Sequence, residues 1–306
     1  MIVFVLKRLG LALLVAFAVS ILSFMLVRLT GDVATAIAGE GARDEDIRLV
    51  RETYGLDRPM IVQYVDWLFG LMRGEFGTSY FFKSPVLDLV LDKLPVTLKL
   101  GLSSLAFALL VAVPLGVVAA LKPNSWIDRL ALGIAVLGQA LPNFFFALLL
   151  VMLFSVTLRW LPVSGSGTPW HFVMPTIALG YYVAPAFMRL VRAGMIEVLG
   201  SDFIRTARAK GLPKRRVVLK HALRNALTPV VALTVVQLGY LLGGSVVIET
   251  IFALDGLGYL AYQSISHKDL PVMQVVVLIL AVIYVLLTLA ADIVNAWLDP
   301  RLRANL

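Results

Sequence analysis

The sequence predicts an all-α integral membrane protein with six transmembrane helices and both termini in the cytoplasm. Its residues are 60% hydrophobic and 15% charged, whereas soluble domains carry about 25% charged residues. Long apolar runs recur along the chain, and a helix of about 20 apolar residues spans a bilayer. The basic residues gather in alternate connections, as expected of cytoplasmic loops. The predicted spans are residues 9–27, 100–121, 130–158, 172–188, 230–247 and 272–298.

The first span follows Lys7 and Arg8. A cleaved signal peptide is the alternative, because residues 34–36 (Ala-Thr-Ala) resemble a cleavage site. The apolar run exceeds the usual 7–15 residues of a signal peptide, which favours a retained helix.

Three parts follow along the chain: a membrane helix at 1–29, an extracytoplasmic extension at 30–95 and a five-span core at 96–306. In the extension, acidic residues outnumber basic ones, and helical patterns cover residues 47–54 and 60–72. In the core, a long basic loop at 189–228 is predicted to be cytoplasmic. The other basic residues predicted on that side are Lys7, Arg8, Lys122, Arg129, Arg301 and Arg303.

A short helix is predicted inside the basic loop. Ser201 is a favourable N-cap, and Asp202 places a negative charge in the first turn. Gly211 can take a left-handed conformation after Lys210, and Pro213 prevents continuation. A helix of about nine residues is too short to be stable alone in water. We therefore expect it to dock against a partner, although an ordinary polar loop with one helical turn fits the same pattern.

Several kinds of chemistry are excluded or disfavoured by composition. The chain has no cysteine, no phosphate-binding G-x-x-x-x-G-K-[ST] motif and only three well-separated histidines, so no metal site is expected. The net charge of +8 is distributed between apolar runs, which indicates a membrane and no nucleic acid. Glu249 and Asp292 lie near span ends, where we expect water to reach them. The scarcity of mid-membrane carboxylates argues against ion coupling and hydrolysis.

Uncharged polar residues within the spans are candidates for a translocation path. They are Gln139, Asn143 and Gln237, although ordinary interhelical hydrogen bonding is an alternative for each. A second set forms a small-residue face for helix packing, with subunit contact or pore lining as alternatives. This set is Gly239, Gly243 and Gly244.

Several motifs resemble the permease subunits of ATP-binding-cassette (ABC) importers, in particular the first permease of the dipeptide/oligopeptide/nickel group, which includes glutathione permeases. The motifs run essentially from end to end of the chain. They are KRLG (7–10), GLDRP (55–59), GEFGTS (74–79), RTARAKGL (205–212), HALRNALTP (221–229), LLGGSVVIETIF (241–252), GLG (256–258) and LDPRLR (298–303).

The resemblance implies a type I importer permease fold in the bacterial inner membrane. It also implies a second permease forming a heterodimer, two ATPase subunits that bind ATP and Mg²⁺, and an extracytoplasmic solute-binding protein. The chain itself would hold no cofactor and no catalytic residue. The family's "EAA" loop carries a helix that couples to the ATPase, and its second alanine and glycine correspond to Ala207 and Gly211. Arg205 and Thr206 replace its glutamate and first alanine. The coupling residues implied are Ser201, Asp202, Phe203, Arg205, Thr206, Ala207, Arg208, Ala209, Lys210 and Gly211.

The predicted function is therefore a permease subunit that moves di- or oligopeptides, or glutathione-like peptides, by alternating access. A permease for nickel or another small solute is the alternative within the class. An ion-coupled secondary transporter and a membrane scaffold or receptor-like protein are alternatives from other classes.

Overall fold

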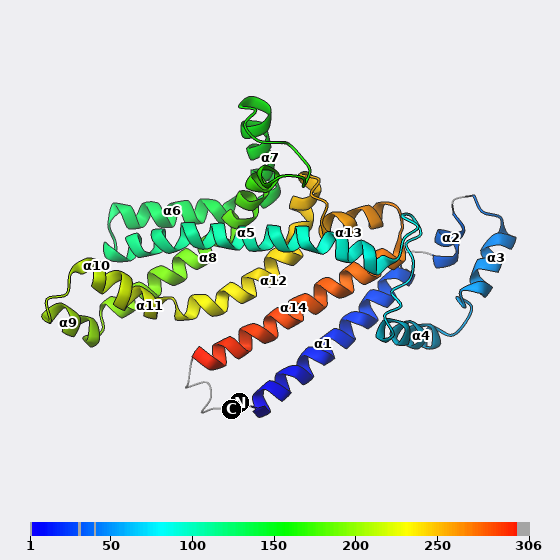
Figure 1. Cartoon of the computed structure of the whole chain (residues 1–306), viewed down its shortest axis with the longest axis horizontal. Helices are drawn as coiled ribbons and strands as arrows, with labels where there is room; N and C mark the ends of the chain where they lie inside the picture. The colour runs from blue at the N-terminus through cyan, green and yellow to red at the C-terminus, as the bar shows by residue number, and fades with distance from the viewer. Residues whose placement is uncertain (1, 30–31, 40, 299–306) are drawn as a thin grey trace.

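The computed structural model describes residues 2–29, 32–39 and 41–298, and every named element in these residues is helical. The long helices form an elongated bundle, with α2 and α3 beyond one end and α9 and α10 beyond the other (Figure 1). The elements are α1 (Ile2–Leu29), α2 (Val33–Ala38), α3 (Asp44–Thr53), α4 (Met60–Met72), α5 (Val86–Leu121), α6 (Trp126–Ala140), α7 (Asn143–Leu150), η1 (Val151–Thr157), η2 (Pro169–Phe172), α8 (Val173–Leu199), α9 (Asp202–Ala209), α10 (Lys214–Arg216), η3 (Val217–Ala222), α11 (Leu223–Ala226), α12 (Thr228–Ile251), α13 (Leu257–Ser266) and α14 (Leu270–Leu298).

The pair α5 and α8 forms the centre of the bundle. At 36 residues α5 is about 54 Å long, and its buried face packs along α8 in the main hydrophobic core. Two glycines let the backbones approach closely. A Cβ atom on Gly180 would lie 2.5 Å from the carbonyl oxygen of Ser104, and one on Gly116 would lie 2.8 Å from that of Met188. A side chain at either glycine would therefore push the two helices apart.

Among the described residues, four helices are long and apolar enough to cross a membrane. They are Leu6–Met25, Val86–Leu121, Thr228–Ile251 and Leu270–Val294. All four coincide with spans predicted from the sequence, which confirms those predictions in position. Of the predicted cytoplasmic residues, Arg301 and Arg303 lie outside the described residues, as does most of the motif at 298–303.

The predicted span at 130–158 is not one continuous helix, because the chain breaks in its middle. Leu141 adopts an extended conformation with ψ 127°, since the ring of the following Pro142 disfavours the helical region for the residue before it. The 15-residue α6 therefore ends at Ala140, and α7 with the π-helical η1 projects away from the bundle (Figure 1).

The other span outside the four is the one predicted at 172–188. It corresponds to α8, which begins at Val173 as expected but continues to Leu199. This extra length carries Arg189 and Arg192, so the helix is long, about 40 Å, but less apolar than the four spans.

The extension forms short helices, as predicted, and packs against the membrane helices at one end. On α4, Tyr64 and Trp67 place their ring centroids 5.3 and 5.6 Å from that of Phe24 on α1. The loop before α5 is held by Asp269, whose buried carboxylate accepts hydrogen bonds from the Ser79 hydroxyl and from two backbone N–H groups. Helix α5 itself begins at Val86, inside the segment 30–95 assigned to the extension.

Candidate functional site

The predicted short helix is present as α9, at the end of the bundle opposite the extension (Figure 1). It contains eight residues, Asp202–Ala209, and hence fewer than the minimum for independent stability. Packing against the rest of the chain fixes it. Ile204 is completely buried and Ala207 is 8% exposed, and both belong to the core cluster that includes η3 and α8. Ala209, by contrast, is exposed.

The N-terminus of α9 differs from the prediction in one detail. Ser201 occupies the N-cap position with an extended backbone, but its side chain accepts no hydrogen bond from the helix. Its hydroxyl instead donates to the Val198 carbonyl oxygen at 2.6 Å. Ser201 therefore ties α9 to the end of α8, and the prediction that its side chain caps α9 is wrong. Asp202 does lie in the first turn, where its charge favours the helix dipole.

The C-terminus of α9 closes in a Schellman motif. Gly211 has φ +75°, the left-handed conformation expected from the sequence. The N–H of Gly211 donates to the Arg208 carbonyl at 2.9 Å, and the N–H of Leu212 donates to the Ala207 carbonyl at 3.4 Å. These two bonds satisfy carbonyls that a helix end otherwise leaves unpaired. The partly buried Leu212 packs on the core and anchors the turn.

The opposite face of α9 is open to solvent and largely polar. Arg205 and Asp202 form an ion pair of 3.1 Å, but their side chains are 74% and 92% exposed. Exposed pairs of this kind contribute little to stability, so the Arg205 guanidinium is accessible to a partner. The exposed residues of α9 and its end are Asp202, Phe203, Arg205, Thr206, Arg208, Ala209, Lys210 and Gly211.

A buried ion pair near α9 was missed in the sequence. Asp128 on α6 is 1% exposed and accepts two hydrogen bonds of 2.6 Å from Arg192 on α8. Hydrogen bonding by Arg192 lowers the pKa of Asp128 below its ordinary value. The carboxylate also accepts the Asn124 N–H at 2.9 Å, and the spacing of Ser125 and Asp128 is a recognisable helix-start signal. The pair clamps α6 to the part of α8 that leads into α9.

The structure does not join the three candidates for the translocation path into one cluster. Gln139 accepts a hydrogen bond of 3.0 Å from Arg189, and both residues are exposed. Asn143 begins α7 and Gln237 lies on α12, each partly buried. Within the described ranges, no hydrogen bond connects any two of these three residues.

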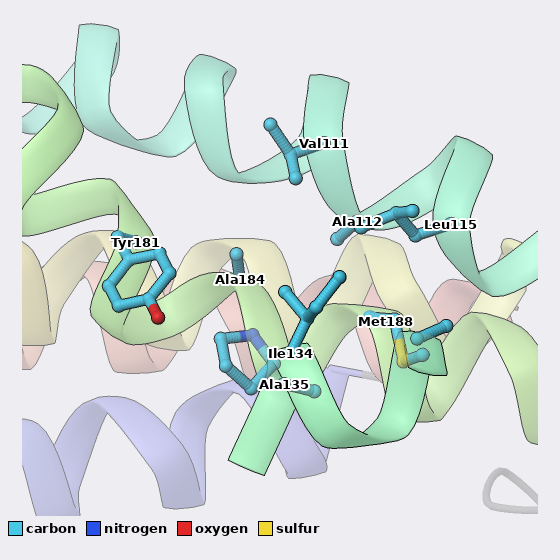
Figure 2. Close-up of a pocket in the computed structure, with 10 residues that line it drawn as sticks. Val111, Ala112, Leu115, Ile134, Ala135, Tyr181, Ala184 and Met188 are labelled. Atoms are coloured by element: carbon cyan, nitrogen blue, oxygen red, sulfur yellow. The ribbon is translucent and has the colours of Figure 1, made fainter. Parts of the chain in front are cut away.

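A small, partly open pocket lies between α5, α6 and α8, with mostly apolar side chains around it (Figure 2). Tyr181 is the one lining residue with a titratable side chain, so the pocket offers no acid–base pair. It is lined by Val111, Ala112, Leu115, Ala131, Ile134, Ala135, Tyr181, Ala184, Pro185 and Met188.

The predicted glycine face on α12 packs at one position only. A Cβ atom on Gly239 would lie 2.9 Å from the Tyr284 ring on α14, which shows close helix contact. Nothing lies within 4 Å of a Cβ atom on Gly243, and Gly244 meets only Tyr240 of its own helix. The last two glycines therefore do not make the contact within the chain that the sequence predicts.

The expectation that water reaches Glu249 is wrong. Its side chain is completely buried between α5, α12 and α13. The carboxylate accepts hydrogen bonds of 2.8 Å from the hydroxyls of Thr97 and Ser245, and one of 3.1 Å from the Tyr259 N–H. These bonds compensate the loss of hydration, so Glu249 joins three helices. Asp292 is partly exposed and forms an ion pair of 2.9 Å with Arg8.

In residues 2–29, 32–39 and 41–298, no three acidic or histidine side chains come together in a way that could hold a metal ion. The site that the geometry offers is therefore a rigid, exposed, basic helix surface.

Comparison with known proteins covers nearly the whole chain. Residues 112–304 match the family described as "Binding-protein-dependent transport system inner membrane component", and residues 1–101 match the N-terminal part of such components. The glutathione transport system permease protein GsiC of Escherichia coli (strain K12) is 40% identical over 301 residues, which cover 98% of each chain. The protein of the same name from Salmonella typhimurium (strain LT2) has the same identity and coverage.

Among solved structures, a chain of the MetNI methionine ABC transporter in an inward-facing conformation is similar, with a TM-score of 0.59. It is 22% identical, and the match covers 70% of this chain and 98% of that chain. This likeness supports the fold of the helical core.

Proposed function

The chain belongs to the family of binding-protein-dependent transport system inner membrane components, and we propose that it is the permease subunit of an ATP-driven importer of di- or oligopeptides or glutathione-like peptides. As a member of this family it is a bacterial inner-membrane transport component and not an enzyme. The peptide class rests on the relatives named as glutathione permeases, which are 40% identical over 98% of the chain.

The observation that carries the mechanism is the construction of α9. The helix is anchored by the buried Ile204, closed by the turn at Gly211, and exposed on its basic face. A rigid surface element of this kind can transmit force without unravelling. In the proposal, α9 docks on an ATPase subunit, and closure of two such subunits on ATP and Mg²⁺ draws the coupling helices together. The membrane helices then reorient between inward and outward access.

The proposed topology has six crossings and cytoplasmic termini. Four crossings are the long apolar helices, α8 supplies the fifth, and α6 with the projecting α7 and η1 supplies the sixth as a broken crossing. Exposed apolar side chains on α7 and η1, including Phe144, Leu148 and Met152, suit a membrane or a neighbouring subunit. A second, homologous permease is the proposed neighbour, and a solute-binding protein delivers solute on the side of α2–α4.

Uptake into liposomes tests this function. The chain is reconstituted with its partner permease, ATPases and binding protein, and labelled glutathione and dipeptides are supplied outside with ATP inside. ATP-dependent uptake that requires the binding protein is the expected result. Uptake by this chain alone, driven by a proton or sodium gradient, would instead establish a secondary transporter.

A further inference from the structure

Lys99 is a charged residue immediately before the predicted apolar span 100–121 of α5. It lies on α5 within a candidate membrane span, with an exposed side chain whose Nζ is 4.1 Å from the centroid of the Phe172 ring. Among the described residues, no carboxylate lies within ion-pair distance of it. Lys93, less than two turns earlier, is instead paired with Asp92 at 2.8 Å and Asp255 at 2.6 Å. Charged groups in membrane helices are costly and tend to mark binding sites or pathways.

Two hydroxyl groups continue the polar character of Lys99 along the seam between α5 and α8. Ser103 lies one turn after Lys99 on the same face of α5, and Thr176 lies one turn after Phe172 on α8. The two hydroxyl oxygens are 2.7 Å apart, and Ser103 donates its own proton to the Leu100 carbonyl at 3.0 Å. Either hydroxyl can donate in this pair, and when Ser103 donates to the Leu100 carbonyl the Thr176 hydroxyl is able to turn towards another acceptor. The seam therefore holds an ammonium group about one helical turn from a pair of hydroxyl groups.

The local field favours an anion. Helix α8 continues directly from the 3-10 helical turn η2 (Pro169–Phe172), and the first turns of both contain no acidic residue. The positive end of the helix dipole therefore adds to the charge of Lys99. The nearest buried acid, Glu249, is enclosed by hydrogen bonds from Thr97 and other groups. The ammonium group and the helix dipole both favour a carboxylate or a phosphate over a cation beside Lys99.

We infer that Lys99 and Thr176 form an anion-binding site that receives a carboxylate of the transported solute at the outer entrance of the path. The position of Lys99 along the bundle follows from Thr97, which lies half a turn before it on α5. Thr97 donates a hydrogen bond to Glu249, which is close to Ile251, the last residue of α12. This is the end of the bundle that carries the extension. The inference rests on the proposed function, because peptides and glutathione all carry a free carboxylate. A lipid phosphate has the same chemistry, and the experiments below separate the two sources.

The first experiment measures the local electric potential without any substrate. Because the chain contains no cysteine, Ser103→Cys introduces a single thiol one turn from Lys99. In the complete importer in membranes, anionic and cationic water-soluble methanethiosulfonate reagents are compared on this thiol. Replacing Lys99 by Gln should lower the ratio of anionic to cationic reaction rates by roughly tenfold, as one unit charge at this separation implies, whereas Lys99→Arg should preserve the ratio. A thiol that fails to react, as at a lipid-covered surface, or a ratio unaffected by the charge, would overturn the site.

The second experiment measures glutathione and dipeptide uptake with a saturating concentration of loaded binding protein. Lys99→Gln should reduce solute transported per ATP by about tenfold while ATP hydrolysis stays within about twofold of wild type. Lys99→Arg should recover most of the uptake. Lys93→Gln, which removes a paired charge from the same helix, is the matched control and should transport normally. Normal uptake by Lys99→Gln would contradict the carboxylate site. A wild-type complex that transports neither glutathione nor dipeptides would instead count against the proposed function, and the thiol measurement would then decide whether the anion site exists.

Discussion

Replacing Gly211 tests whether the rigidity of α9 matters for coupling. The residue has φ +75°, and a Cβ atom there would meet nothing within 4 Å, so a substitution acts through backbone strain alone. The left-handed conformation costs a residue other than glycine about 1–2 kcal/mol. That strain opposes the two hydrogen bonds that close the helix, from the N–H groups of Gly211 and Leu212. It shifts the balance between closed and unravelled ends by about 5–30-fold.

The assay is ATP hydrolysis by the reconstituted importer, with and without loaded binding protein, alongside uptake. Gly211→Ala should lower uptake per ATP, and Gly211→Val should lower it further because its branched side chain is less tolerant of positive φ. Gly211→Asn is the control, since asparagine tolerates this conformation, and it should behave almost as wild type. If Ala and Val variants couple as tightly as the Asn variant, the reasoning about a rigid coupling helix is wrong.

Three further predictions concern the packing that supports α9 and the core. Gly180→Ala should lower the free energy of unfolding by about 1–3 kcal/mol, measured by thermal unfolding in detergent. Gly133→Ala is the control, because a Cβ atom at Gly133 meets open space, and it should be neutral or stabilising by up to about 1 kcal/mol. Equal effects of the two substitutions would contradict the close contact of α5 and α8. Arg192→Met should destabilise by about 2–3 kcal/mol because the buried Asp128 carboxylate loses two of its three hydrogen-bond donors and its counter-charge. Arg192 lowers the pKa of Asp128, so the pair stabilises the fold at pH values above the ordinary carboxyl pKa and loses this effect as the pH falls through the lowered pKa. The difference in melting temperature between wild type and Asp128→Asn should therefore shrink below about pH 4. A difference that stays constant with pH would contradict the pairing. Glu249→Gln should yield folded protein and Glu249→Leu should not, because leucine leaves the buried Thr97 hydroxyl and the partly buried Tyr259 N–H without their acceptor. Equal yields of monodisperse protein would refute this.

The sequence predicted most of the fold, because apolar length and charge alternation are local signals. The four long spans appear where these signals lie, and the helical patterns predicted at 47–54 and 60–72 correspond to α3 and α4. The sequence predicts one span across Pro142, whereas the structure has two helices that meet there. A proline inside an apolar run predicts either a kink or an end, and the contacts that α7 makes with α8 and α12 belong to tertiary structure.

For the candidate site, the turn at Gly211 was predictable from glycine followed closely by proline, and the direction of the Ser201 hydroxyl was not. Whether a serine caps the next helix or bonds backwards to the previous one depends on the angle between α8 and α9. The contacts of Asp128 with Arg192 and of Glu249 with Thr97 join residues far apart in the sequence. No periodicity in the sequence encodes such pairs, so only the structure could find them.

The most direct test of the central claim is cross-linking from α9 to an ATPase subunit. Phe203→Cys places a single thiol on the exposed face of α9 in a chain that has no other cysteine, and Ile61→Cys on the distant, exposed α4 is the control. In the assembled importer, a thiol–amine cross-linker should join position 203 to an ATPase subunit, with a yield that changes when ATP binds, while position 61 should give no such product. Equal yields from both positions, or none from position 203 in a complex that still hydrolyses ATP, would contradict the assignment of α9 as the coupling helix.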